Sequence, residues 1–368
     1  MARSTVSHVF NGTAPISQAT AERVIQAALR LGYVPRSQRR RGPNSRQVVI
    51  FKNMIPGPRQ EAWSTSHEDL AEAILAAAYP VFRDQGVDVW IVPFEGDEVA
   101  NGIHQRYLTG FAGALVIDSS TRSFSAFPDI PLPTVLAYCT AEAKPVLSVV
   151  PDNFRGGYEA TRHLIRHGRK QIAFISGPMH WSASHDRLTG YMTALHEFGL
   201  QHDPALIASG DWSVESGFRA VGELLSAVSF DALFVANDLM AVGAVQALRQ
   251  AGLRVPEDVA VVGFDNRNVA CFTDPPLTTV QLPLGNIGRR AALELLRLIK
   301  QGDRGDETSA SRIQIHCPLV VRQSCGCGLP GEGRVDEAAA VAGSCDGAVP
   351  GDEAQSFSSS KHNPCGGR

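Results

Sequence analysis

The 368-residue sequence lacks the features that mark membrane and secreted proteins. No run of about 18 apolar residues occurs, so we expect no transmembrane helix and no membrane partner. The N-terminus has no basic segment followed by an apolar stretch and a small-residue cleavage site, which argues against secretion. The seven cysteines are scattered and odd in number. This usage indicates reduced thiols and a cytoplasmic location.

Common catalytic and cofactor-binding signatures are also missing. The chain contains no GxSxG, HExxH, P-loop or GxGxxG motif, so an enzyme would lack both a nucleophile–base pair and a phosphate loop. Gly156-Gly157 opens a predicted helix after a strand, where close helix–strand packing explains two glycines better than phosphate binding. We therefore expect no catalytic residue, no cofactor and no enzymatic activity.

The sequence offers little for a metal ion. Cys325-Gly326-Cys327 is too closely spaced for a usual zinc knuckle, and the sequence shows no second pair to partner it. Four histidines lie near one another, but surface or hydrogen-bonded structural roles explain them better: His163, His167, His180 and His185. We therefore expect no metal site.

What the chain does have is an uneven distribution of charge. The net charge is −3 overall, yet residues 1–47 hold eight arginines and a single acidic residue, a net +7. The remainder must then carry about −10. A basic head on an acidic body is the electrostatic pattern of a nucleic-acid contact at one end, although a solvated basic linker has the same composition.

The basic head also has a helical pattern. Val6, Val9 and Phe10 fall on one helical face, and the opposite face carries Arg3, Ser4, Ser7 and His8, which are groups suited to a DNA groove. A second helix follows, with Ser17 as N-cap, and ends at Gly32 and Pro35. These two helices form two thirds of a three-helix DNA-binding head, and the helix that should precede them is absent.

Beyond residue 46, short apolar runs alternate with helical patterns up to about residue 323. This alternation predicts βαβ units and parallel sheets covered on both faces. About ten predicted strands suit two sheets better than one. We therefore expect an α/β fold of two Rossmann-like lobes, with a ligand bound between them at the carboxyl ends of the strands.

Polar side chains follow several of the predicted strands. The Asx pairs are Asp152-Asn153, Asn237-Asp238 and Asp265-Asn266. Helix N-capping explains each pair alone. Together with Arg187 and Trp212 they fit a sugar-binding pocket better, because carboxylates and amides pair with hydroxyls, arginine offers a planar fork and an indole packs on a sugar ring.

The same residues carry a family resemblance from residue 2 to about 325. The chain resembles LacI/GalR-type transcriptional regulators in the order and spacing of its short motifs. The strings that carry the resemblance are Thr5 to Gly12, Arg23 to Pro35, Val150 to Asn153, Gly210-Asp211-Trp212-Ser213, Ala236-Asn237-Asp238, Val255 to Asp265 and Asp274 to Val280.

The resemblance implies a homodimer that binds a palindromic DNA operator and is switched by a small effector, usually a sugar or a nucleoside. It implies that Arg187, Trp212, Asn237 and Asp265 line the effector pocket of a periplasmic-binding-protein-like body. Groove and phosphate contacts are implied for a further set, with the arginine run following the head: Arg3, Ser4, Thr5, Ser7, His8, Asn11, Arg39, Arg40 and Arg41.

Two features of the N-terminal region differ from the family pattern. The usual first helix of the head is missing, so either the true start lies upstream of Met1 or this form binds DNA poorly. The hinge region contains Gly42-Pro43 and no leucine, which leaves it without the usual wedge for the minor groove. In the first lobe, Pro56-Gly57-Pro58 replaces the usual segment after the first strand.

These observations predict a domain order. The predicted domains are a partial helix-turn-helix head over 1–35 (recognition helix 2–11, third helix 17–31), a basic linker over 36–46, a two-lobed domain over 47–328 and a disordered tail over 329–368. The N-lobe would comprise about 47–150 plus 277–302, and the C-lobe about 151–276 plus 303–325. The alternatives are a truncated effector sensor without strong DNA binding, a sugar-binding module and an enzyme.

Overall fold

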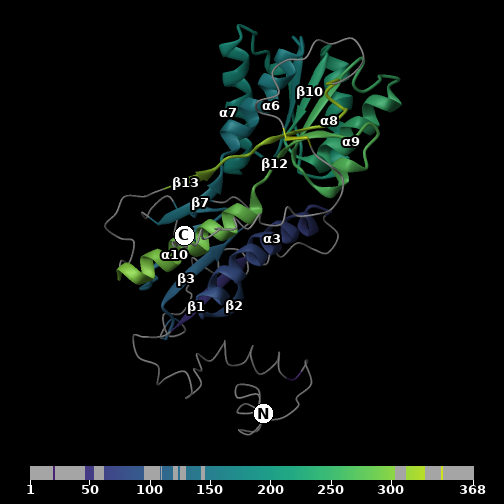
Figure 1. Cartoon of the computed structure of the whole chain (residues 1–368). Coiled ribbons are helices and arrows are strands. Elements are labelled where there is room, and N and C mark those ends of the chain that lie inside the picture. Colours follow the sequence, from purple (N-terminus) through teal and green to yellow (C-terminus); the bar gives the residue numbers. More distant parts are fainter. Residues whose placement is uncertain are drawn as a thin grey trace, which may run out of the picture.

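The computed structural model describes residues 20, 46–53, 62–94, 108, 110–118, 123–124, 130–141, 146–302, 312–327 and 341–342. The predicted DNA-contacting residues, from Arg3 to Arg41, lie outside these residues, as do the Gly42-Pro43 hinge and Pro56-Gly57-Pro58. The described chain forms two α/β lobes, each built on its own sheet (Figure 1). This confirms the predicted fold class for the body of the protein.

The first sheet has the order β13-β7-β5-β3-β1-β2, and all five of its strand pairs are parallel. Helices α3 and α10 pack against each other, and α10 contacts β3, β5 and β7. The elements are β1 (Gln47–Asn53), α3 (Ala62–Asp84), β2 (Asp88–Phe94), β3 (Gly113–Ile117), β5 (Thr134–Ala137), β7 (Leu147–Pro151), α10 (Leu284–Gln301) and β13 (Arg312–Ile315). Two short strands, β4 (Ser123–Phe124) and β6 (Thr140–Ala141), pair separately.

The second sheet has the order β15-β14-β12-β11-β10-β8-β9. Helices α6 and α7 pack together, as do α8 and α9, and the two pairs lie on opposite sides of the sheet (Figure 1). The elements are α6 (Asn153–Arg166), β8 (Ile172–Ser176), α7 (Ser182–Glu197), η1 (Pro204–Leu206), β9 (Ile207–Ser209), α8 (Val214–Ala227), β10 (Ala232–Val235), α9 (Asp238–Gln250), β11 (Ala260–Asp265), η2 (Asn268–Cys271), β12 (Thr278–Gln281), β14 (Leu319–Val321) and β15 (Val341–Ala342).

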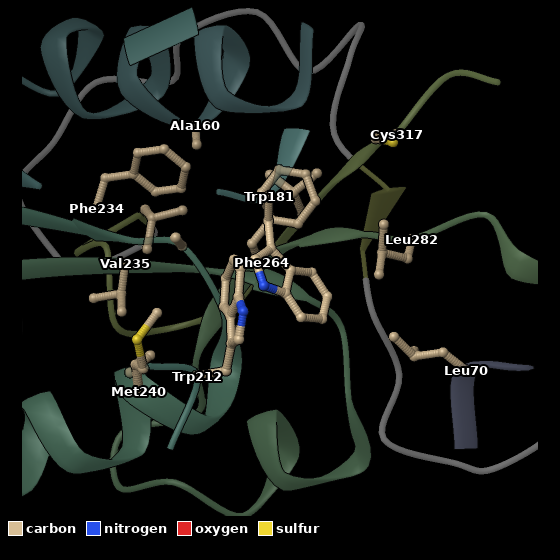
Figure 2. Close-up of a cluster of buried hydrophobic side chains, with 14 of the residues drawn as sticks. Leu70, Ala160, Trp181, Trp212, Phe234, Val235, Met240, Phe264, Leu282 and Cys317 are labelled. Atoms are coloured by element: carbon tan, nitrogen blue, oxygen red, sulfur yellow. The ribbon is translucent and has the colours of Figure 1, made fainter. Parts of the chain in front are cut away.

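The central strands of both sheets are buried on both faces, as the continuous apolar runs predict. Strands β3, β7 and β8 have every residue buried. Most buried side chains belong to one large cluster that includes residues of both lobes, and a smaller cluster lies within the first lobe. Figure 2 shows the part of the large cluster around Trp181, Trp212 and Phe264. In that view Leu70 approaches from α3, while Leu282 and Cys317 come from segments that connect the lobes.

The points where the chain crosses between lobes differ from the prediction. The sequence pattern places residues 277–302 in the N-lobe, but β12 pairs with β11 in the second sheet and α10 alone belongs to the first. It places residues 303–325 in the C-lobe, but β13 pairs with β7 in the first sheet. Residues 312–321 therefore form two strands, β13 and β14, which are separated by residues 316–318 and lie one in each lobe.

The sequence also supports predictions for the packing of Gly156 and for the C-terminal tail. Gly156 packs against the sheet as predicted, since a Cβ there would meet the Phe264 ring at 2.8 Å. The composition of the tail predicts disorder throughout, but Val341–Ala342 extends the edge of β14 as a short parallel strand. An apolar pair beside an open sheet edge gains backbone hydrogen bonds there, which the tail's composition does not reveal. None of the described helices is both long and apolar enough to cross a membrane.

Candidate functional site

The candidate site is built on the carboxyl ends of parallel strands in the second lobe. Asp265 ends β11, Asn237 follows β10, and Trp212 lies between β9 and α8. Arg187 comes from the first two turns of α7 and is 2% exposed. The four effector residues predicted from the sequence are thus brought together.

Arg187 is the centre of this group. Its Nη1 lies 3.5 Å from Asp265 Oδ1, and its Nε donates to Asn153 Oδ1 at 3.0 Å. The same Nη1 also donates to the carbonyl of Ala236. The Phe264 ring lies under the guanidinium, with its centroid 3.7 Å from Cζ. This cation is therefore held on several sides, in one orientation, by a carboxylate, an amide and an aromatic face.

Trp212 contributes the aromatic wall. Its ring centroid is 5.8 Å from the Cζ of Arg187, and it meets Trp181 edge to face at 5.9 Å (Figure 2). The indole is 5% exposed, and its Nε1 has no hydrogen-bond partner in the described structure. The Oγ of Ser184, three residues after Trp181, is likewise buried without a partner in those residues. Buried polar atoms are normally paired, so these two donors indicate a place for polar groups of a ligand.

Asn237 has a different part in the site. Its Oδ1 accepts from Met240 N at 2.9 Å and so caps α9, and its Nδ2 donates to the carbonyl of Trp212 at 3.1 Å. Asp152 likewise caps α6 by accepting from Arg155 N at 2.9 Å. Both ends of the Asn237 amide are used inside the protein. It therefore fixes the backbone that presents Trp212, as the capping interpretation of these residues indicates.

Backbone strain gathers at the same place. The described chain has four non-glycine residues with positive φ, namely Tyr138 (67°), Trp212 (73°), Asp265 (110°) and Asn266 (54°). For bulky residues this conformation is costly and persists only where the surroundings enforce it. Arg322 Nη2 donates to Asn266 Oδ1 at 2.8 Å, which supports one of these strained residues.

Two carboxyl groups sit in this buried environment. Burial raises the pKa of Asp265, against the opposing charges of Arg187 and Arg267. Burial, together with the neighbouring charge of Asp265, raises the pKa of Asp238 to about 8. Asp238 accepts from Thr279 Oγ1 at 2.6 Å and from Arg267 N at 2.7 Å.

The first lobe has polar residues at the carboxyl ends of its strands that were not among those predicted from the sequence. Tyr138 directly follows β5, is 3% exposed and interacts electrostatically with Arg187 and Asp265; its burial raises the pKa of its hydroxyl. At the ends of β1 and β3, Asn53 Nδ2 donates to Asp118 Oδ1 at 2.9 Å, and Asn53 Oδ1 has no hydrogen-bond partner among the described residues. Asn53 and Asp118 are Asx residues at strand ends, so the signal that found Asp265 would have found them too, whereas Tyr138 follows a strand but is not an Asx residue.

Comparisons with known proteins identify the family. The model "Bacterial regulatory proteins, lacI family" matches residues 2–36, and the model "Periplasmic binding protein-like domain" matches residues 161–325. The transcriptional regulator CelR of Thermobifida fusca is 33% identical over 338 residues, covering 88% of this chain and 94% of CelR. The transcriptional repressor CytR of Escherichia coli K12 is 32% identical, covering 87% of this chain and 92% of CytR.

Comparison with solved structures leads to the same family. A complex of the regulator CelR with cellobiose is 31% identical and has a TM-score of 0.62, covering 88% of this chain and 96% of that one. The lac repressor dimer bound to operator shares the fold, with a TM-score of 0.63 at 24% identity, covering 88% of this chain and 94% of that one. The chain is therefore a member of the LacI family of bacterial transcriptional regulators, with a family DNA-binding region ahead of a two-lobed body.

Proposed function

We propose that this protein is a cytoplasmic repressor that binds operator DNA as a homodimer and is switched by a sugar bound between its lobes. Two observations support the DNA role. The relatives CelR and CytR are HTH-type transcriptional regulators, and the lacI-family model matches residues 2–36. The DNA contacts proposed are those of the basic head and linker: Arg3, Ser4, Thr5, Ser7, His8, Asn11, Arg39, Arg40 and Arg41. No enzymatic step is needed for this function.

The observation that carries the choice of effector is the buried Arg187–Asp265 pair beside an indole with an unused N–H. A sugar presents hydroxyls that accept from arginine and indole N–H groups and donate to a carboxylate, while its ring packs on an aromatic face. The solved CelR relative holds cellobiose, a disaccharide. We therefore propose Arg187, Trp212 and Asp265 as direct sugar contacts, with Asn237 positioning Trp212.

Tyr138 lies near Arg187 and Asp265, so the proposed site has residues from both lobes, and this suggests how sugar binding changes DNA binding. The second lobe supplies Arg187 and Asp265, while Tyr138 extends from the first sheet. A ligand that contacts both sides binds better to one angle between the lobes than to another, and this differential affinity is what shifts the equilibrium. The two DNA heads of a dimer move apart or together with that angle.

Calorimetric titration of the full-length protein with cellobiose, other disaccharides, hexoses and nucleosides tests the site. We expect one class of saccharide to bind, and Arg187→Lys to weaken it by at least about tenfold because lysine lacks the planar fork. The matched control is Arg249→Lys, since Arg249 is 71% exposed and pairs with Asp274 on the surface. Binding of no saccharide, or equal binding by Arg187→Lys, would contradict the proposed site.

A further inference from the structure

A second cluster of polar side chains lies away from the sugar site, where the last described residues of the body meet α6. Cys327 Sγ lies 3.2 Å from His163 Nε2 and 3.0 Å from His167 Nε2. The three ligand atoms all fall within 4.8 Å of one another. Cys325 Sγ is 3.1 Å from Cys327 Sγ. The sequence pattern predicts no partner pair for these cysteines, and the structure supplies one from about 160 positions earlier.

Each half of the cluster is held by its own element. His163 and His167 are four residues apart at the end of α6, so their rings project from the same face of the helix. Gly326 has φ of +88°, a conformation that lets the chain turn sharply between the two cysteines. Ser324 fixes this turn to the sheet, because its Oγ donates to Val261 O at 2.6 Å and accepts from Thr278 N at 2.8 Å.

We propose that His163, His167, Cys325 and Cys327 bind a single Zn²⁺ ion. Two imidazole nitrogens and two thiolates are a common tetrahedral ligand set for structural zinc. With zinc–ligand bonds of about 2.0–2.3 Å, tetrahedral geometry places ligand atoms about 3.3–3.8 Å apart. The separations of 3.0–3.2 Å around Cys327 are close to these values, and the ligand atoms of His163, His167 and Cys327 already lie within 4.8 Å of one another. Cys325 is not part of that group, so its side chain would turn from Cys327 toward the imidazoles to complete the set.

The surroundings favour a closed structural site over a disulfide. The two sulfurs are 3.1 Å apart and unbonded, whereas a disulfide requires about 2.05 Å. Thr278 Oγ1 donates to Cys325 Sγ at 3.1 Å, the kind of outer hydrogen bond that orients a metal-bound thiolate. Cys325 is 2% exposed, so its sulfur faces the cluster rather than solvent.

The proposed ion would join two segments that matter to the effector site. Residues 322–327 follow β14, which the chain reaches after its last crossing from the first lobe. Helix α6 begins with Asn153, the residue that accepts from Arg187. Zinc would therefore link residues 322–327, which lie just beyond the last crossing between the lobes, to α6, which follows the first crossing. This role goes beyond sugar binding and does not depend on which sugar binds.

Cobalt and zinc titrations of the full-length protein test the site. The protein is reduced, stripped with a chelator and titrated with Co²⁺, which reports tetrahedral thiolate coordination through visible and charge-transfer absorption. We expect one Co²⁺ per chain with both features, displaced by Zn²⁺. X-ray absorption of the zinc-loaded wild type should show sulfur near about 2.3 Å and nitrogen near about 2.0–2.1 Å. An all-oxygen shell, or no thiolate signal, would overturn the proposal.

Variants identify the ligands. Cys327→Ser and His167→Asn should weaken Co²⁺ binding by at least about tenfold, because each loses a ligand matched to zinc. The matched controls Cys271→Ser and His185→Asn change a cysteine and a histidine outside the cluster and should bind as wild type. Zn²⁺ should raise the melting temperature of the wild type and both controls but not of the two ligand variants. Wild-type cobalt affinity in the ligand variants would refute the assignment.

Discussion

At the scale of single residues, Arg187 combines structural and binding roles. It is buried with Asp265, and removing one member of a buried pair leaves the other charge uncompensated, which costs about 3–5 kcal/mol. Truncation to alanine would therefore disturb the fold as well as binding. Arg187→Lys keeps the charge, which makes it the sharper substitution at this position.

Trp212 permits a cleaner separation of binding from stability. Its Nε1 has no partner in the described structure, so Trp212→Phe removes a donor that the protein does not use. We expect sugar affinity to fall about tenfold, the value of one hydrogen bond of about 1.4 kcal/mol. The free energy of unfolding without sugar should also fall, by about 1–2 kcal/mol, because phenylalanine leaves part of the space of the buried indole empty. Calorimetry and denaturant unfolding measure the two quantities.

Tyr191→Phe is the control that should lower stability without lowering sugar affinity. The Tyr191 hydroxyl donates to the carbonyl of Ile172 at 2.8 Å inside the second lobe. Its loss should cost about 1 kcal/mol of stability and leave sugar affinity unchanged. If Trp212→Phe lowered stability as Tyr191→Phe does while keeping sugar affinity, the indole would be a core residue and not a ligand contact.

Asp238 gives a prediction for pH. Its pKa of about 8 in the folded protein lies above the value of about 3.9 in an unfolded chain. The folded state thus binds more protons between these values. The Asp238 contribution to stability is therefore fully present below about pH 4 and is lost as the pH rises through about 8.

Comparison with Asp238→Asn isolates this contribution, because asparagine does not titrate. Between about pH 5 and pH 8.5, we expect the free energy of unfolding of the wild type, relative to that of Asp238→Asn, to fall by more than about 1.4 kcal/mol. This is the free energy that corresponds to a shift of about one pKa unit. Denaturant unfolding at both pH values measures it. A difference that stays constant with pH would show that Asp238 is ionised throughout.

At the scale of elements, glycines set how closely the helices of the second lobe approach. A Cβ on Gly190 would clash with the carbonyl oxygen of Phe154, and one on Gly157 would lie 2.5 Å from that of Arg187. Helices α6 and α7 therefore touch backbone to backbone, and this contact places Arg187 beside Asn153. The Gly156-Gly157 pair serves packing on both the sheet and the neighbouring helix.

Gly190→Ala should separate α6 from α7. We expect it to lower the free energy of unfolding by about 1–3 kcal/mol, since the contacting atoms are backbone and cannot swing away. On α8, a Cβ added to Gly222 would meet no atom within 4 Å, so Gly222→Ala should instead stabilise by about 0.5–1 kcal/mol. Denaturant unfolding compares the two, and equal effects would refute the close-approach argument.

Whether a site residue could be predicted from the sequence depends on where it lies in its helix or strand. Polar residues at strand ends are visible in sequence, which is why Asp265 and Asn237 could be found. Tyr138 escaped prediction because it belongs to no Asx pair and lies in the first lobe. The four proposed zinc ligands escaped it for a different reason, since only the packing of residues 322–327 on α6 brings them together.

At the scale of the whole molecule, the chain crosses between lobes three times. The crossings follow β7, β12 and β13. The sequence could predict two lobes, because strand and helix patterns alternate over a length that suits two sheets. It could not place β12 and β13, because a short apolar run looks the same whichever sheet it joins.

The most direct test of the account is the effect of the bound sugar on DNA affinity. Full-length protein first selects a duplex from a random pool, and its Kd for that duplex is then measured with and without the saccharide identified by calorimetry. We predict a change of about 5–150-fold, the usual range of allosteric coupling. Arg187→Lys, at the same saccharide concentration, should bind the duplex with little or no such change. Failure to select any duplex, or a saccharide that binds without altering DNA affinity, would contradict the account.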